Sequence, residues 1–253
     1  MSFPKKFDKI KRKYDGNDKG DTMIKGVIFD MDGLMFDTES LTVAAFQRGM
    51  LKEGLDPLPD HAFAHLFGRK LSEVVAFFET ATHDHAAAER ITAERERYIE
   101  QALAGGFFNQ KPGLVALLDY LRAEGLPHIV ASSSPRWQIE RNLKATHIDD
   151  YFEQIFSSEQ VARAKPAPDV FLGAAAAMGV SPGNCLVLED SINGIQAAAA
   201  GGMIPVMIPD LRQPDAETRG MAAAVFNNLE QVIPWIALQN KAKYQQEELD
   251  GAQ

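Results

Sequence analysis

The chain has 253 residues and a formal net charge of −9, and 45% of its residues are hydrophobic. This length and composition fit a globular protein with one large domain, or with a core domain and an inserted lobe. The acidic balance argues against nucleic acid as the main partner, because binding DNA or RNA normally needs a basic face. The single cysteine, Cys185, excludes an intramolecular disulfide and favours a reducing cytoplasm. No apolar run approaches the ~20 residues of a membrane span, so no membrane contact is expected.

The first 23 residues differ in character from the rest of the chain. They carry seven Lys or Arg and four Asp or Glu residues, or +3 by count, and they lack the apolar stretch of a secretion signal. We interpret residues 1–23 as a basic, flexible leader on the basis of this composition. An arm that binds anions or nucleic acid is the alternative interpretation.

The first predicted element is a buried parallel strand at residues 24–30, and it ends in the turn signal DMDG. From about residue 39 to 105 the apolar residues recur every three to four positions, which predicts helices, and strand signals are absent. After Pro112, predicted helices and strands alternate. The helices are expected at 113–125, 136–145, 169–179, 192–202 and 229–238, and the strands at 128–132, 154–158, 185–189, 204–208 and 223–226.

This alternation predicts an α/β fold with a Rossmann-like parallel sheet, covered by helices on both faces. We interpret the helical segment as an all-α cap domain that is inserted into that fold. We expect the core to comprise residues 24–38 and 109–238, and the cap to comprise residues 39–108. A polar C-terminal tail is expected at residues 239–253.

Polar residues follow four of the predicted strands. They are Asp30 and Asp32 after the first, Ser132 at the end of the second, Lys165 in the loop past the third, and Glu189 and Asp190 at the end of the fourth. Because ligands bind beyond the carboxyl ends of such strands, adjacent strands would bring these side chains together. Four carboxylates in one crevice favour a bound cation, and oxygen ligands favour Mg²⁺. A lysine beside such a metal cluster indicates a polyanion that contacts both, such as a phosphoryl group.

Four segments resemble the motifs of one enzyme superfamily. Asp30-Met31-Asp32-Gly33, within DMDGLMFDT, looks like the nucleophile motif of the haloacid dehalogenase superfamily of phosphatases. The segments ASSS, KPAPDVF and LEDSING resemble the second, third and fourth motifs of that family, in the same order. The resemblance spans residues 24 to about 235 and includes a helical cap inserted after the first motif.

The resemblance implies a role for each matching residue. Asp30 would attack phosphorus and become an aspartyl-phosphate, and Asp32 would act as general acid and base. The ligands of Mg²⁺ would be the Asp30 carboxylate, the Asp32 main-chain carbonyl and Asp190. Glu189 would bind the metal directly or through water, and the residues leave both options open.

Five further positions are candidates for binding the substrate. Ser132 and Lys165 would hold phosphoryl oxygens, as the resemblance implies, and the main chain of Ser133 would touch the same group. In the predicted cap, Arg69 and Lys70 of FGRK are candidates for recognising the rest of the substrate. The expected partner is a small phosphorylated metabolite, and the protein is expected to be a monomer.

The expected reaction is Mg²⁺-dependent hydrolysis of a small phosphomonoester, of the sugar phosphate or nucleoside monophosphate class. Parts of the chain also resemble pseudouridine-5′-phosphatase-like and sugar-phosphate phosphatases. A β-phosphoglucomutase-type mutase is the alternative, although that group has a histidine where this chain has Thr42. Dehalogenation would leave Asp32 without a role, and the phosphonate hydrolases lack the aspartate at that position. A non-catalytic sensor of phosphorylated metabolites on the same fold is a further alternative. Such a sensor would tolerate loss of Asp32, but this chain retains it.

Overall fold

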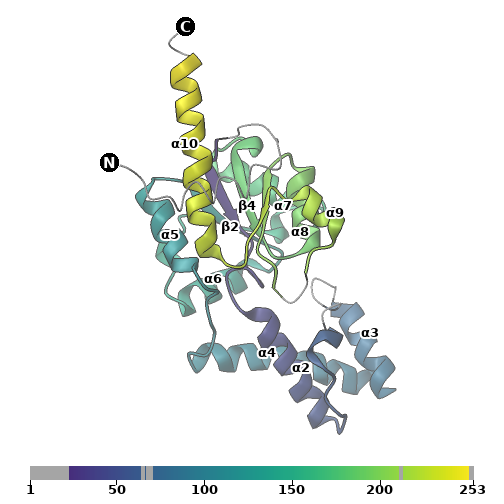
Figure 1. Cartoon of the computed structure of the whole chain (residues 1–253). Coiled ribbons are helices and arrows are strands. Elements are labelled where there is room, and N and C mark those ends of the chain that lie inside the picture. Colours follow the sequence, from purple (N-terminus) through teal and green to yellow (C-terminus); the bar gives the residue numbers. More distant parts are fainter. Residues whose placement is uncertain (1–22, 64–65, 67–70, 211–212, 251–253) are drawn as a thin grey trace.

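A computed structural model describes residues 23–63, 66, 71–210 and 213–250. These residues form a core around a parallel sheet, with a group of helices beyond one end of that sheet (Figure 1). The expected α/β fold with an inserted helical cap is therefore confirmed. The predicted basic leader, apart from Met23, lies outside the described residues. Within the described part of the chain, no helix is both long enough and apolar enough to cross a membrane.

The sheet has six parallel strands in the order β3-β2-β1-β4-β5-β6. They are β1 (Gly26–Phe29), β2 (His128–Ser132), β3 (Ile155–Ser157), β4 (Cys185–Glu189), β5 (Ile204–Met207) and β6 (Ala224–Val225). This is the strand order of a Rossmann-type fold, and the order reverses at the central strand β1. The carboxyl ends of β1 and β4 therefore flank the place where ligands bind in such sheets.

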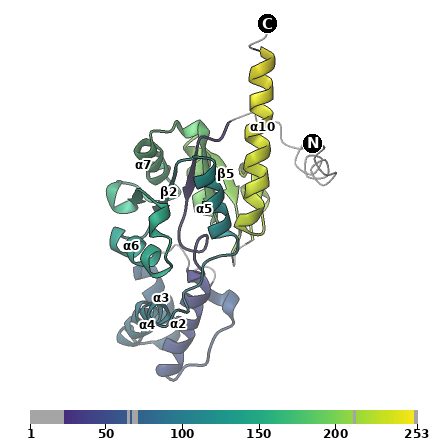
Figure 2. The same cartoon turned by 90° about the vertical axis from the view of Figure 1, so that its left-hand side faces the viewer.

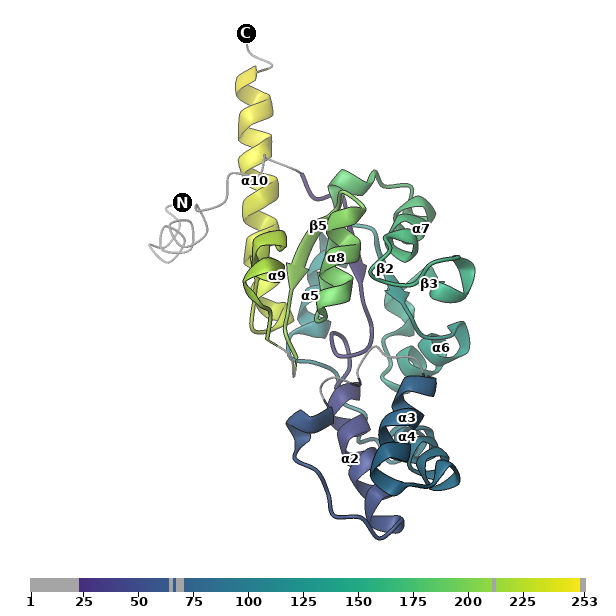
Figure 3. The same cartoon turned by 90° about the vertical axis from the view of Figure 1, so that its right-hand side faces the viewer.

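Helices cover both faces of the sheet, as Figure 3 shows for α5 and α8. They are α5 (Leu114–Ala123), α6 (Arg136–Ala145), α7 (Asp169–Met178), α8 (Ile192–Ala200), α9 (Ala216–Met221) and α10 (Val232–Asp250). Successive strand residues point to opposite faces. Val27 and Phe29 accordingly pack in the cluster with α5 and α10, whereas Ile28 packs in the cluster with α7 and α8. Both faces of β1 are buried, which explains its continuous apolar run.

Two helical segments differ from the sequence prediction. Helix α10 continues to Asp250, through most of the residues for which a polar tail was expected. Its last part, rich in Gln, Glu, Lys and Ala, has high helix propensity, and this favours a helix even without an apolar stripe. Helix α9 was not predicted because it has only six residues. The Asp215 side chain begins it by accepting a hydrogen bond from the Thr218 N–H at 2.7 Å.

The inserted helices have a hydrophobic core of their own. They are α2 (Thr38–Lys52), α3 (Leu71–Thr82) and α4 (His85–Ala104). Phe46, Phe63 and Phe78 meet at the centre of this group. A Cβ at Gly49 would lie 3.0 Å from the Ile91 Cα, so this glycine lets α2 and α4 approach closely. Figure 2 shows the group beyond one end of the sheet, with the free end of α10 pointing the other way.

Candidate active site

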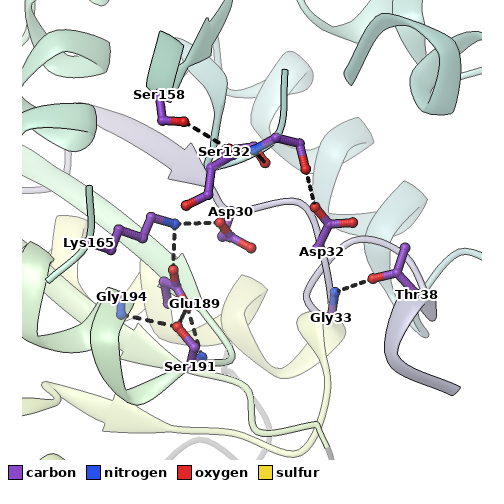
Figure 4. A network of polar contacts seen from close by, with 12 residues as sticks. Asp30, Asp32, Gly33, Thr38, Ser132, Ser158, Lys165, Glu189, Ser191 and Gly194 are labelled. Atoms are coloured by element: carbon purple, nitrogen blue, oxygen red, sulfur yellow. Dashed lines mark hydrogen bonds and ion pairs between the residues drawn. The ribbon is translucent and has the colours of Figure 1, made fainter. Parts of the chain in front are cut away.

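Three buried side chains from separate parts of the chain meet where the strands end (Figure 4). Asp30 follows β1, Glu189 ends β4, and Lys165 lies in the loop between β3 and α7. The Lys165 ammonium donates to Asp30 Oδ1 at 2.5 Å and to Glu189 Oε1 at 2.7 Å. The structure thus brings together two acids and the lysine that lie up to 159 positions apart in the chain, as Asp30 and Glu189 do.

The acids at this point form a compact, buried cluster. One carboxylate oxygen from each of Asp30, Glu189 and Asp190 lies within 4.8 Å of the others. Burial raises the pKa of Asp30 to about 7, and the charges of Glu189 and Asp32 add to this effect while Lys165 opposes it. Burial and the neighbouring carboxylates also raise the pKa of Asp190 well above its ordinary value. Negative charge on these carboxyl groups is therefore unfavourable without a counter-charge, and the cluster supplies the oxygen ligands that a hard divalent cation prefers.

Lys165 is held in its charged form by this cluster. Burial by itself lowers the pKa of Lys165, but the charges and hydrogen bonds of Asp30 and Glu189 raise it above the ordinary value. The side chain is only 8% exposed. A buried ammonium of this kind presents a fixed positive charge to whatever anion enters the site.

Glu189 is held from two sides. Its Oε1 accepts the bond from Lys165, and its Oε2 accepts from both the main-chain N–H and the Oγ of Ser191, each at 2.8 Å. Ser191 is also the N-cap of α8, because its Oγ accepts a hydrogen bond from the Gly194 N–H at 3.1 Å. The position of Lys165 is therefore tied through Glu189 to the first turn of α8.

The turn after the two aspartates packs tightly against Asp190. Gly33 has φ +85°, and a Cβ at this position would lie 2.2 Å from Asp190 Oδ2. Its N–H donates to Thr38 Oγ1 at 3.0 Å, at the start of α2. Only glycine suits both the backbone conformation and the close approach. The turn at Gly33 therefore packs directly against Asp190, a candidate metal ligand.

The serine loop after β2 lies on the other side of Asp30. Ser132 is 1% exposed, and its Oγ accepts a hydrogen bond from the Ser134 N–H at 3.0 Å. Ser133 is exposed, and its carbonyl accepts from Ser158 Oγ at 2.8 Å. The Ser134 Oγ donates to Asp32 Oδ2 at 2.7 Å. Ser134 was not among the predicted site residues, although it is the third serine of the run ASSS that carried the resemblance.

The two connections to the helical insert are joined beside the site. Lys111 donates to Asp210 Oδ1 at 2.6 Å and to Asp37 Oδ1 at 3.4 Å. Asp37 lies where the chain enters the insert, and Lys111 lies where it returns to the core. Lys111 was not among the predicted site residues, because nothing in its local pattern shows these distant partners.

Two candidates of the cap, Arg69 and Lys70, lie outside the described residues. Thr42, the position that separates the phosphatase and mutase patterns, is buried on α2. Its Oγ1 accepts a hydrogen bond from Arg95 Nε of α4 at 3.1 Å. Thr42 therefore packs between two helices of the insert.

A family model described as haloacid dehalogenase-like hydrolase matches residues 27–208, which is more than half of the chain. The chain belongs to the haloacid dehalogenase-like hydrolase family. The matched span includes every loop that contributes to the acid cluster and the helical insert as well. The resemblance inferred from the four motifs is thereby confirmed, and so is the expectation of an enzyme of this hydrolase class.

Individual relatives are similar over most of the chain. Hexitol phosphatase B of Escherichia coli strain K12 is 30% identical over 186 residues, which cover 74% of this chain and 84% of that protein. A probable pseudouridine-5′-phosphatase of Drosophila melanogaster is 33% identical over 199 residues, covering 76% and 84%. The crystal structure of a putative β-phosphoglucomutase from Thermotoga maritima has a TM-score of 0.70 at 24% identity, covering 85% and 99%, and it shows a shared fold.

Proposed function

We propose that the protein is a phosphoric monoester hydrolase that acts on a small phosphomonoester, such as a sugar phosphate or a nucleoside monophosphate. The observation that carries this proposal is the buried Lys165 ammonium, bonded to Asp30 beside the acid cluster. Transfer of a phosphoryl group needs a nucleophile and a fixed positive charge that stabilises the phosphoryl oxygens. The names of the hexitol and pseudouridine-5′-phosphatases support the substrate class.

The acid cluster fits a magnesium ion. Its carboxylates are buried, and Lys165 bonds Asp30 and Glu189 of the three acids. Burial raises the pKa of both Asp30 and Asp190, which is the condition under which a cation is strongly favoured. Asp30, Asp190 and the main-chain carbonyl of Asp32 would hold the ion. When bound, it would neutralise negative charge on the phosphoryl oxygens. Both oxygens of Glu189 already accept hydrogen bonds, which supports a role in holding Lys165.

The chain's own residues supply two displacement steps in this proposal. In the first, a carboxylate oxygen of Asp30 forms a bond to phosphorus while the bond to the leaving oxygen breaks, and Asp32 gives its proton to that oxygen. In the second, Asp32 takes a proton from water, whose oxygen attacks phosphorus and releases Asp30 and inorganic phosphate. Lys165 and Ser132 would hold the phosphoryl oxygens during both steps.

Removal of divalent metal is expected to abolish activity. Exhaustive treatment with EDTA should lower phosphate release at least ~100-fold, and added Mg²⁺ should restore it. Ca²⁺ should inhibit, because its looser coordination shell disturbs the alignment of nucleophile and leaving group. Thermal unfolding gives a second readout: saturating Mg²⁺ should raise the melting temperature of the metal-free protein by roughly 5 °C.

Asp190→Asn is the matched variant for the thermal measurement, because it keeps the shape of a ligand and removes its charge. The Mg²⁺-dependent rise in melting temperature should largely disappear in this variant. Full activity after chelation, or an unchanged thermal shift in Asp190→Asn, would contradict the proposed metal site.

The rate of phosphomonoester hydrolysis is expected to exceed the rate of a phosphosugar mutase reaction by a wide margin. A mutase must keep its aspartyl-phosphate from water until the phosphoryl group returns to a sugar, and in the mutase pattern a histidine contributes to that control. Thr42 cannot transfer a proton near neutral pH, since among unperturbed side chains only imidazole titrates there. We therefore expect inorganic phosphate to be released from a panel of sugar phosphates and nucleoside monophosphates.

The deciding assay supplies β-glucose 1-phosphate with a trace of the 1,6-bisphosphate. Glucose 6-phosphate and inorganic phosphate are measured in the same reaction. Formation of glucose 6-phosphate much faster than free phosphate would overturn the proposed hydrolase and restore the mutase.

A further inference from the structure

The side chain of Ser134 contacts the aspartate to which the proposed mechanism assigns proton transfer. Its Oγ donates to Asp32 Oδ2 at 2.7 Å, the bond drawn to Asp32 in Figure 4. The other oxygen, Asp32 Oδ1, is buried and has no hydrogen-bond partner among the residues that the structure describes. A carboxylate held at one oxygen presents the other in a defined direction. Ser134 therefore contributes a contact that sets the orientation of Asp32.

The loop that carries Ser134 is itself held in place. The Ser134 N–H donates to Ser132 Oγ at 3.0 Å, and the Ser134 carbonyl accepts from Ser157 Oγ at 2.8 Å. One residue earlier, the Ser133 carbonyl accepts from Ser158 Oγ at 2.8 Å. These three bonds use main-chain atoms of the loop and side chains from the end of β2, the end of β3 and the residue that follows β3. The Ser134 hydroxyl takes no part in them, so its removal leaves the loop held.

We propose that Ser134 is a positioning residue, whose hydroxyl orients the Asp32 carboxyl group for proton transfer to the leaving oxygen. This inference rests on the proposed function, in which Asp32 protonates that oxygen. A side-chain hydroxyl on a clamped loop costs little reorganisation at the moment of reaction, which is the general advantage of preorganised polar groups. Without the bond, the carboxyl group can rotate about its side-chain torsions. A smaller share of its conformations then points the proton at the leaving oxygen.

The inference predicts an effect that depends on the leaving group. Phenyl phosphate releases a phenol with a pKa of about 10, like the tyrosine side chain, and its departure benefits from protonation. The leaving group of p-nitrophenyl phosphate has nearly the same shape. Its electron-withdrawing nitro group stabilises the departing anion, so it can leave without protonation. Ser134→Ala should lower kcat/KM for phenyl phosphate about tenfold and for p-nitrophenyl phosphate less than about twofold, since general acids contribute roughly 10²–10⁴-fold and only orientation is lost.

Three variants serve as controls in the same assays with Mg²⁺ present. Ser134→Thr keeps the hydroxyl and should restore most of the activity toward phenyl phosphate. Ser158→Ala is the matched serine deletion, because it removes a bond to the same loop without touching Asp32. Any loss in Ser158→Ala should be equal for the two esters. Asp32→Asn removes the proton donor and should show the largest difference between them.

The outcomes separate this inference from the proposed function. A loss in Ser134→Ala that is equal for the two esters, or that Ser134→Thr does not reverse, would overturn the positioning role while the hydrolase proposal stands. Failure of the wild-type protein to release phosphate from any phosphomonoester would overturn the proposed function and this inference with it. A loss confined to phenyl phosphate, reversed by threonine, supports the inference.

Discussion

Replacing Asp30 with asparagine is expected to abolish phosphate release while the protein remains folded. An amide oxygen is a poor nucleophile, so the first displacement cannot begin, and the loss should be at least ~10⁴-fold in kcat. The new side chain has nearly the same shape. Burial raises the pKa of Asp30 to about 7, which means that the metal-free site accommodates a neutral group at this position without a large cost. Lys165 keeps its second partner, Glu189, at 2.7 Å.

The measurement has three parts. Phosphate release is followed with the best substrate of the panel, folding is followed by urea denaturation without metal, and acid-quenched protein is analysed by mass spectrometry for a covalent phosphoryl group. The wild type should carry the group on Asp30, and Asp30→Asn should carry none. Asp119→Asn is the matched control, because Asp119 lies on α5, outside the acid cluster, and accepts a hydrogen bond from the Tyr151 hydroxyl. Activity of Asp30→Asn near that of Asp119→Asn would disprove the nucleophile assignment.

Replacing Gly194 with alanine is expected to lower both the activity and the stability of the protein. A Cβ at this position would lie 1.8 Å from both Cδ and Oε1 of Glu189, so the carboxylate would have to move. Glu189 is 1% exposed and bonded to Lys165 and Ser191, and movement would break these bonds inside the protein. We expect about 3 kcal/mol of destabilisation from overpacking and from the disturbed buried ion pair. Since Lys165 would lose its support, kcat should fall about 100-fold.

Gly220→Ala provides a matched control in another helix. Gly220 lies in α9 with nothing within 4 Å of the added Cβ, and it does not have a positive φ. This variant should keep wild-type activity and gain about 0.5 kcal/mol, because alanine has the higher helix propensity. Urea denaturation and phosphate release are measured for the two alanine variants side by side. The close packing of Gly194 on Glu189 would be refuted if the two variants behaved alike.

The helices and strands that the sequence predicted best are those with a single environment along their length. The strands expected at 128–132 and 185–189 agree residue for residue with β2 and β4, because a strand buried on both faces is a continuous apolar run. Helix α6, expected at 136–145, also agrees at both ends. Helix α10 differed because its last part is stabilised by propensity, which leaves no periodic apolar pattern to detect.

Within the candidate site, the sequence determined which residues gather and the fold decided how they are used. The convergence of Asp30, Lys165 and Glu189 was predictable, because parallel strands bring their carboxyl ends to one edge of the sheet. The bond from Ser134 to Asp32 joins loops 102 positions apart, and the bond from Lys111 to Asp210 joins loops 99 positions apart. Local periodicity reports which face of an element is buried, but not which atoms of two distant loops meet. The packing of Gly194 against Glu189 likewise depends on where α8 begins relative to β4, which only the tertiary structure decides.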